Sequence, residues 1–231
     1  MHGSWYQKAV GDYRELLRQG TRIHVGKGTR VVDSQKKLEY VYYLEKGVIA
    51  LVDLMEDGDE RVFRYHKQGE LLGIFQLYNM VPSLKNSVQH TVCHIYDSVS
   101  KSECVLYRLE PRVVLEFLFE NPEILVEQVR STAKINMSHC FRYSKMLKNR
   151  TPNILCEMLL EFAHLSEGAW KLDKYFSNAE IARYLGVHVV TVGKIIGKLK
   201  EDGLIDRKNG QLVILDREGI EEYLGEKNMK Y

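Results

Sequence analysis

One stretch of the 231-residue chain, Glu123–Arg150, runs for 28 residues without a proline or a glycine. Asn121 can cap a helix and Pro122 suits its first turn, whereas Thr151-Pro152 stops or bends it. The stretch therefore predicts a helix longer than most globular domains contain. A helix of this length indicates a seam against another helix.

A stripe of side chains spaced three and four residues apart follows this helix and crosses several heptads. The stripe is partly polar, so it matches a coiled coil only moderately. Its members are Val126, Val129, Ala133, Asn136, Cys140, Tyr143 and Leu147. We expect this stripe to pair two copies of the chain. The alternative is a single long helix that packs on its own domain.

The residues before the long helix have the texture of short strands, rich in β-branched and aromatic side chains. Glu56-Asp57-Gly58-Asp59 marks a hairpin turn, and Pro111 opens a helix over Arg112–Glu120. Several strands at this spacing predict a β-sandwich or β-roll. The expected strands are Thr21–Val25, Tyr40–Glu45, Val48–Met55, Arg61–His66 and Ser102–Leu109.

Composition places the chain among soluble globular proteins, with 45% hydrophobic and 28% charged residues. No apolar run approaches a membrane span and no signal peptide is recognisable, so we expect a cytoplasmic protein with no membrane partner. No nucleophile–base pair is evident, and Gly26-Lys27-Gly28-Thr29 lacks the spacing of a phosphate loop, so an enzyme is not expected. The four cysteines are widely spaced and read as reduced thiols, although separation alone does not exclude a redox disulfide.

The segment Phe176–Lys200 carries the strongest local signal. Ser177 and Glu180 have the spacing of a capping box, and Gly186 suits a left-handed turn before a second helix that starts near His188. A short helix, a glycine turn and a second helix predict a helix-turn-helix. The expected buried faces are Ile181, Ala182 and Leu185 on the first helix, and Val192, Ile195, Ile196 and Leu199 on the second.

A hairpin follows, because Arg207-Lys208-Asn209-Gly210 lies between two apolar runs, and this completes a winged helix. The winged region is acidic overall, whereas its helix-turn-helix is locally basic, as a DNA-facing helix requires. The alternative is a winged helix that binds protein through a solvated helix. The four cations that make the helix-turn-helix basic are Arg183, Lys194, Lys198 and Lys200.

Residues 176–215 resemble the DNA-binding domain of the Crp/Fnr family of transcription regulators. Leu44-Glu45-Lys46-Gly47-Val48 and Gln68-Gly69-Glu70-Leu71-Leu72-Gly73 resemble the β-roll of that family, and the long helix lies where the family has its dimerisation helix. The resemblance implies an α+β protein with three parts: a cyclic-nucleotide-binding-like β-roll (jelly roll, 1–121), a dimerisation helix (122–151) and a winged helix-turn-helix (152–231). It also implies a bacterial homodimer that binds double-stranded DNA at a palindrome, responds to a small-molecule effector and contacts RNA polymerase.

In this docking geometry the start of the second helix faces base edges. Valine packs against thymine methyls but cannot hydrogen-bond a base, so Val189 and Val190 favour a site richer in A·T than most family members read. The run from His188 to Lys194 is similar to the halorespiration regulators within the family, which read A·T-rich palindromes. The expected base-facing residues are His188, Val189, Val190, Thr191 and Lys194, and the expected phosphate contacts are Ser177, Asn178 and Lys198.

The effector is not expected to be cyclic AMP. By the resemblance, Gly73-Ile74-Phe75-Gln76 stands where the family's cyclic-AMP binders have Gly-Glu-Leu-Gly, and His94-Ile95-Tyr96 stands where they have Arg-Ser/Thr-Ala. A small aromatic acid suits the cleft instead, as in the halorespiration regulators. A pocket filled by its own side chains remains the alternative, and the chain has an extra stretch near residues 79–90. The expected effector residues are Gly73, Ile74, Phe75, His94, Ile95, Tyr96, Ala133 and Asn136.

Other sensing chemistries have less support. The first 92 residues lack cysteine, which argues against an iron–sulfur sensor. His90, Cys93 and His94 can ligate haem or a metal, but no fourth ligand is evident, so no metal site or resident cofactor is expected. A redox or haem sensor and a constitutive DNA binder without an effector remain alternatives.

Overall fold

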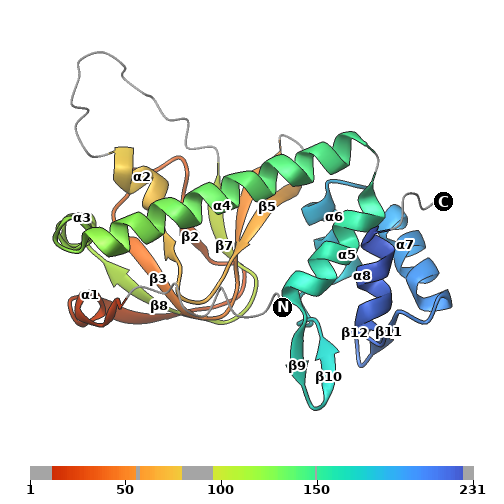
Figure 1. The fold of residues 1–231 in the computed structure, drawn as a ribbon. Helices are drawn as coiled ribbons and strands as arrows, with labels where there is room; N and C mark the ends of the chain where they lie inside the picture. Colours follow the sequence, from red (N-terminus) through yellow and green to blue (C-terminus); the bar gives the residue numbers. More distant parts are fainter. Residues whose placement is uncertain (1–11, 56–57, 80–95, 149, 226–231) are drawn as a thin grey trace. The chain divides into compact units, whose positions relative to one another are not determined.

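The computed structural model describes residues 12–55, 58–79, 96–148 and 150–225. Packing divides the chain into two compact units, Met1–Ala133 and Lys134–Tyr231, and the boundary falls inside α4 (Pro122–Leu147). The first unit is built mainly from strands and the second mainly from helices (Figure 1). In the described part of the chain no helix is both long and apolar enough to span a membrane.

Two four-stranded antiparallel sheets form the β-roll of the first unit. One sheet has the order β1-β8-β3-β6 and the other has the order β2-β7-β4-β5. The strands of the first sheet are Thr21–Val25, Cys104–Leu109, Val41–Lys46 and Leu71–Leu72 in that order; those of the second are Arg30–Val32, Asp97–Ser100, Ile49–Leu54 and Glu60–His66. The five expected strands are therefore confirmed to within two residues of their predicted bounds.

Apolar side chains from both sheets meet in one core cluster, so the sheets pack on one another. Its buried members are Val32, Leu44, Ile49, Leu72, Cys104 and Leu106. The buried thiol of Cys104 has its pKa raised by desolvation. The second cluster of the unit packs α1 (Arg14–Arg18), α2 (Ile74–Asn79) and α3 (Pro111–Glu120) on the roll.

Three strands of the first unit were not predicted, namely β2, β6 and β7. The strand β7 is buried throughout, yet three of its four residues are polar. Asp97 accepts a hydrogen bond from the Ser34 backbone N–H at 2.7 Å, and Ser100 accepts one from the Thr29 backbone N–H at 2.8 Å. Buried polar groups require such partners, and these lie too far away in sequence to be recognised as a pattern.

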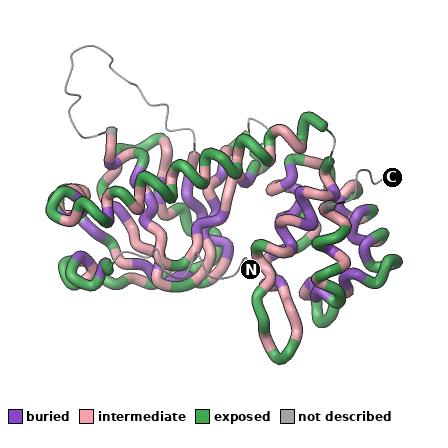
Figure 2. The backbone as a smooth tube through the Cα atoms, in the orientation of Figure 1, coloured by how far each residue is buried: buried purple, intermediate pink, exposed green. Residues whose placement is uncertain are grey.

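The long helix α4 is shorter than expected, because it ends at Leu147 and not at Arg150. It ends before Thr151-Pro152, and Pro152 lies in the first turn of the next helix, α5 (Thr151–Phe162), where a missing N–H costs nothing. All seven residues of the predicted stripe are exposed in the single chain, including Val129 and Leu147, which are 59% and 67% exposed. Among the described residues, the partly polar stripe thus stays open to solvent, and Figure 2 shows α4 as mostly exposed or half-buried.

The second unit contains the helix-turn-helix, and one prediction within it was wrong. The helix expected over Ile154–Leu165 ends at Phe162. The residues after it form β9 (His164–Ser166), which pairs with β10 (Ala169–Lys171) across the turn at Glu167-Gly168. The apolar spacing of the helix continues into the residues of β9, so the sequence pattern does not show where the helix ends. Only the pairing of β9 within the sheet β11-β12-β10-β9 distinguishes the strand from the helix.

Candidate DNA interface

The first helix of the motif, α6 (Asn178–Leu185), begins and ends at the predicted residues. The Glu180 backbone N–H donates to Ser177 Oγ at 3.2 Å, which is the expected cap. Gly186 ends the helix with φ of +67°, in the left-handed region that side chains resist. Its predicted apolar face is buried, namely Ile181, Ala182 and Leu185.

The second helix, α7 (Val189–Glu201), starts with His188 as its cap. The Val190 backbone N–H donates to His188 Nδ1 at 3.3 Å, so the neutral ring carries its proton on Nε2. The predicted buried face is confirmed, and the opposite face is open to solvent. Val189 and Val190 are 40% and 57% exposed, and Lys194 is exposed one turn further on, whereas Thr191 is half-buried.

The cations of the motif are not equally available. Lys198 donates to Asp202 at 2.8 Å, and this hydrogen bond raises the pKa of the lysine. Lys200 lies 3.1 Å from Asp206. Arg183 pairs with the buried Glu180 at 3.4 Å.

Lys194 differs from the other three. Within the described ranges, no hydrogen bond or ion pair joins its ammonium to another residue. The local excess of charge inferred from the sequence is therefore largely neutralised by the domain's own carboxylates. Lys194 is the cation that can meet a nucleic acid without breaking a contact.

The two predicted phosphate contacts on α6 differ in their surroundings. Ser177 is exposed at the cap, and Asn178 is half-buried beside the wing formed by β11 (Ile205–Lys208) and β12 (Gln211–Ile214). Arg207 of β11 donates to Asn178 Oδ1 at 2.7 Å. No local pattern pointed to this contact, because the two residues are 29 positions apart.

The last turns of α4 belong to this unit and pack beside α6. The guanidinium of Arg142 lies 4.6 Å from the centre of the Tyr184 ring, and Lys145 forms an ion pair with Glu157 of α5. A Cβ on Gly186 would lie 3.3 Å from Met146 Cε, so the turn glycine also permits this close packing. The end of α4 is thus attached to the helix-turn-helix.

The predicted effector residues are only partly gathered. Ile74 is buried in the core of the first unit and Phe75 is 52% exposed, while Gly73 precedes α2 with φ of +85°. Tyr96 packs on Phe63 with ring centres 4.3 Å apart. Ala133 and Asn136 are exposed on α4 but fall in different units. His94 and Ile95 lie outside the described residues, as do His90 and Cys93.

Glu70, in the Gln68–Gly73 segment of the β-roll, has its carboxylate engaged by other side chains of the chain. Arg64 forms an ion pair with its carboxylate, and His66 Nδ1 lies 3.2 Å from the same oxygen. Burial opposes ionisation, but the hydrogen bond to His66 and the Arg64 charge prevail and hold the pKa of Glu70 below its usual value. This carboxylate is therefore engaged within the β-roll.

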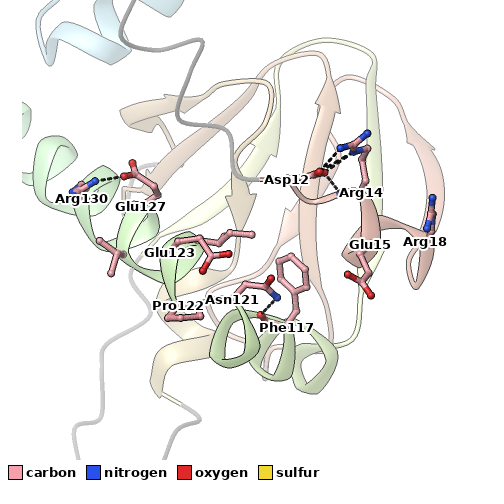
Figure 3. A pocket seen from close by; sticks show the side chains of 12 residues that line it. Asp12, Arg14, Glu15, Arg18, Phe117, Asn121, Pro122, Glu123, Glu127 and Arg130 are labelled. Atoms are coloured by element: carbon pink, nitrogen blue, oxygen red, sulfur yellow. Dashed lines mark hydrogen bonds and ion pairs between the residues drawn. The ribbon is translucent and has the colours of Figure 1, made fainter.

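A cleft of about 990 Å³ lies elsewhere in the first unit, beside α1 and the junction of α3 with α4 (Figure 3). Its walls mix both charges: Arg130 pairs with Glu127, and Arg14 pairs with Asp12. Hydrogen bonds from the side chain and backbone of Arg14 lower the pKa of Asp12 to about 2. None of the predicted effector residues that the structure describes lines this cleft.

The described residues contain no group of three or more His, Cys, Asp or Glu side chains that could hold a metal ion. Of the cysteines in those ranges, Cys104 and Cys156 are buried free thiols and Cys140 is an exposed one. Desolvation raises the pKa of Cys156 to about 12, so it stays protonated near neutral pH.

Replacing Ser177 with alanine is expected to lower the free energy of unfolding of the second unit by about 1 kcal/mol, because the Glu180 N–H loses its acceptor. Urea unfolding followed by Trp170 fluorescence in a Trp5→Phe background measures this. The Ser177→Asp variant retains an acceptor and should remain close to the parent. Equal losses in both variants would show that the cap does not stabilise α6.

An exposed helix after a glycine turn, flanked by a two-stranded wing, defines a winged helix-turn-helix DNA-binding protein. Residues 155–223 match the Crp-like helix-turn-helix domain family, and residues 22–121 match the cyclic nucleotide-binding domain family. Together these ranges span most of the chain, which belongs to the Crp/Fnr family. It is a DNA-binding transcription regulator and not an enzyme.

Known relatives agree with this membership. The chain is 23% identical over 199 residues to the cAMP-activated global transcriptional regulator CRP of Pasteurella multocida, covering 85% of this chain and 86% of that protein. A Crp/Fnr-family regulator of Thermus thermophilus has the same fold, with a TM-score of 0.68, 20% identity and coverage of 90% and 100%. The structure of CprK complexed with OCPA matches with a TM-score of 0.61 at 16% identity. The match covers 91% of this chain and 92% of that chain.

Proposed function

We propose that this regulator binds an A·T-rich palindrome as a homodimer and that a small-molecule effector other than a cyclic nucleotide controls it. The observation that carries the base preference is the exposed tip of α7, where Val189 and Val190 present methyl groups and no hydrogen-bonding atom. Thymine methyls are the groups in the major groove that such side chains contact best.

Specific hydrogen bonding at this tip is left to His188 and Lys194. The His188 ring offers an Nε2–H donor, because its Nδ1 accepts from the Val190 backbone N–H. Lys194 can donate to guanine or to a phosphate, and only the first of these reads sequence. Ser177, Asn178 and Lys198 are assigned to the phosphate backbone, with Lys198 exchanging Asp202 for a phosphate oxygen.

The homodimer is assigned to the stripe of α4, whose seven residues are exposed among the described residues of the single chain. A two-fold axis parallel to this helix would bring each stripe against its copy and bury it. In functional terms the chain divides into an effector domain (1–121), a dimerisation helix (122–151) and a DNA-binding domain (152–231). We also assign to the DNA-bound dimer a contact with RNA polymerase.

The effector is assigned to the class of small aromatic acids. Glu70 is occupied by Arg64 and His66, and Ile74 offers a hydrocarbon where a ribose needs a carboxylate. The rings of Phe63, Tyr96 and the exposed Phe75 supply apolar surface in the same domain. The similarity of α7 to the halorespiration regulators favours this class further.

Selection from random duplex DNA tests both halves of the proposal. Purified full-length protein is incubated with the duplex library alone, with a panel of small aromatic acids, and with cyclic nucleotides. We expect an A·T-rich palindrome that is enriched at least about fivefold by an aromatic acid, the lower range of allosteric coupling. Enrichment by cyclic AMP would overturn the effector assignment. A G·C-rich site would overturn the base preference assigned to α7.

The same experiment distinguishes a constitutive regulator. If the palindrome is enriched equally without any added compound, the β-roll serves dimerisation only and the effector assignment fails. The base preference would still hold, because it depends on α7 and not on the β-roll.

A further inference from the structure

We propose that Arg207 is a positioning residue for DNA binding, which turns the side-chain amide of Asn178 so that its NH2 group faces a DNA phosphate. The inference rests on the proposed function only in placing Asn178 at the DNA backbone. It adds a residue of the wing that reaches the DNA contact through another side chain.

The geometry joins three places in the second unit. Arg207 Nη2 donates to Asn178 Oδ1 at 2.7 Å, and Arg207 Nη1 donates to the backbone carbonyl of Gly210 at 3.0 Å. One guanidinium therefore connects the wing strand β11, the tip of the wing and the first residue of α6. Both Arg207 and Asn178 are half-buried, so neither side chain is free to rotate as a surface residue is.

The orientation of the Asn178 amide follows from hydrogen-bond chemistry. A guanidinium has five N–H donors and no acceptor, so its partner atom on Asn178 must be the oxygen. The two N–H donors of the amide then point away from Arg207. A phosphate oxygen only accepts hydrogen bonds, so this orientation suits it, whereas the flipped amide would offer an oxygen and repel it.

The backbone around Arg207 is itself held in place. Its N–H donates to Asp206 Oδ1 at 2.7 Å, and Asp206 also pairs with Lys200 of α7. The wing turn has positive φ at Asn209 and Gly210, 50° and 81°, which is the geometry of a tight two-residue hairpin. Gln211 Nε2 donates to the Leu172 carbonyl at 3.0 Å. These contacts fix the backbone that carries the Arg207 guanidinium.

A double-mutant cycle on DNA affinity tests the proposal. Arg207→Ala, Asn178→Ala and the double variant are titrated with the selected palindromic duplex at several salt concentrations. We expect each single variant to bind about tenfold more weakly, the scale of one charge-assisted hydrogen bond. The double variant should lose no more than either single one, because both changes remove the same contact.

Salt dependence separates positioning from direct contact. Asn178 carries no charge, so the slope of log affinity against log salt should be unchanged in Arg207→Ala. A cation that neutralises a phosphate contributes about 0.9 to that slope. Additive losses in the cycle with a shallower slope would show that Arg207 contacts phosphate directly and would overturn the proposal, as would full affinity in either single variant.

Two further variants test whether Arg207 acts by orienting the Asn178 amide. Arg207→Lys keeps a group that only donates, so it should bind within about threefold of wild type, whereas loss as large as in Arg207→Ala would contradict the orientation argument. Lys171→Ala removes a cation from the same unit that pairs with Glu167 at 2.5 Å, and it should leave affinity unchanged. Lys194→Ala, measured on the same duplex, tests separately the DNA contact assigned to α7. Its failure to change affinity would overturn that assignment without affecting the cycle.

Discussion

Lys194→Glu is expected to abolish DNA binding, with a loss of affinity of about 100-fold or more. Losing one cation–phosphate or cation–guanine contact weakens binding by roughly 1–3 kcal/mol, and the introduced carboxylate adds repulsion from the DNA backbone. DNA affinity should be more sensitive to this position than to the other basic positions of the motif. Those cations pair with carboxylates of the domain, whereas among the described residues no carboxylate pairs with Lys194. Titration of a labelled symmetric duplex with the dimer measures the effect.

Lys171→Glu is the matched control in the same unit. Lys171 lies on β10 and pairs with Glu167, so the charge reversal should change DNA affinity much less, provided that circular dichroism shows the fold to be intact. Normal binding by Lys194→Glu would show that α7 does not face DNA in the assigned way. Lys194→Ala on duplexes of varied sequence then separates guanine from phosphate, because loss of a phosphate contact weakens all duplexes equally.

Val129→Asp is expected to convert the dimer into a monomer at micromolar concentration and to reduce affinity for the palindrome by about 100-fold. Val129 is 59% exposed in the middle of the stripe on α4, so the single chain loses little when it is replaced. A dimer would bury a carboxylate against its own copy across the two-fold axis, which is strongly unfavourable. Loss of the dimer also removes the gain from binding two half-sites together.

Analytical ultracentrifugation measures the association state, and the same DNA titration measures the affinity. Ser131→Asp is the control, since Ser131 is also exposed on α4 but lies on the opposite side of the helix from Val129. It should remain dimeric. A dimeric Val129→Asp would place the interface elsewhere, and monomers in both variants would show that the helix does not tolerate any added charge.

Patterns confined to neighbouring residues were predicted well. The cap at Ser177, the turn at Gly186 and the buried face of α7 depend on contacts within a few positions, so their residue types are sufficient to predict them. The wing hairpin at Asn209-Gly210 is of the same kind. Errors occurred where the local pattern was ambiguous, as at Leu165, whose apolar side chain fits a helix but belongs to β9.

The sequence by itself determined the order of the parts, the helix-turn-helix and the valines at its tip, because helix periodicity, caps and turn glycines act locally. The tertiary structure decided which charges are available. It paired Lys200 with Asp206, engaged Glu70 with Arg64 and His66, and set Arg207 against Asn178. Several of these partners are brought together only by the folded backbone. The pairs Lys198–Asp202 and Arg183–Glu180, by contrast, join residues one helical turn apart. Electrostatic and hydrogen-bonding partners depend on distance in space, which a linear pattern of residue types does not contain.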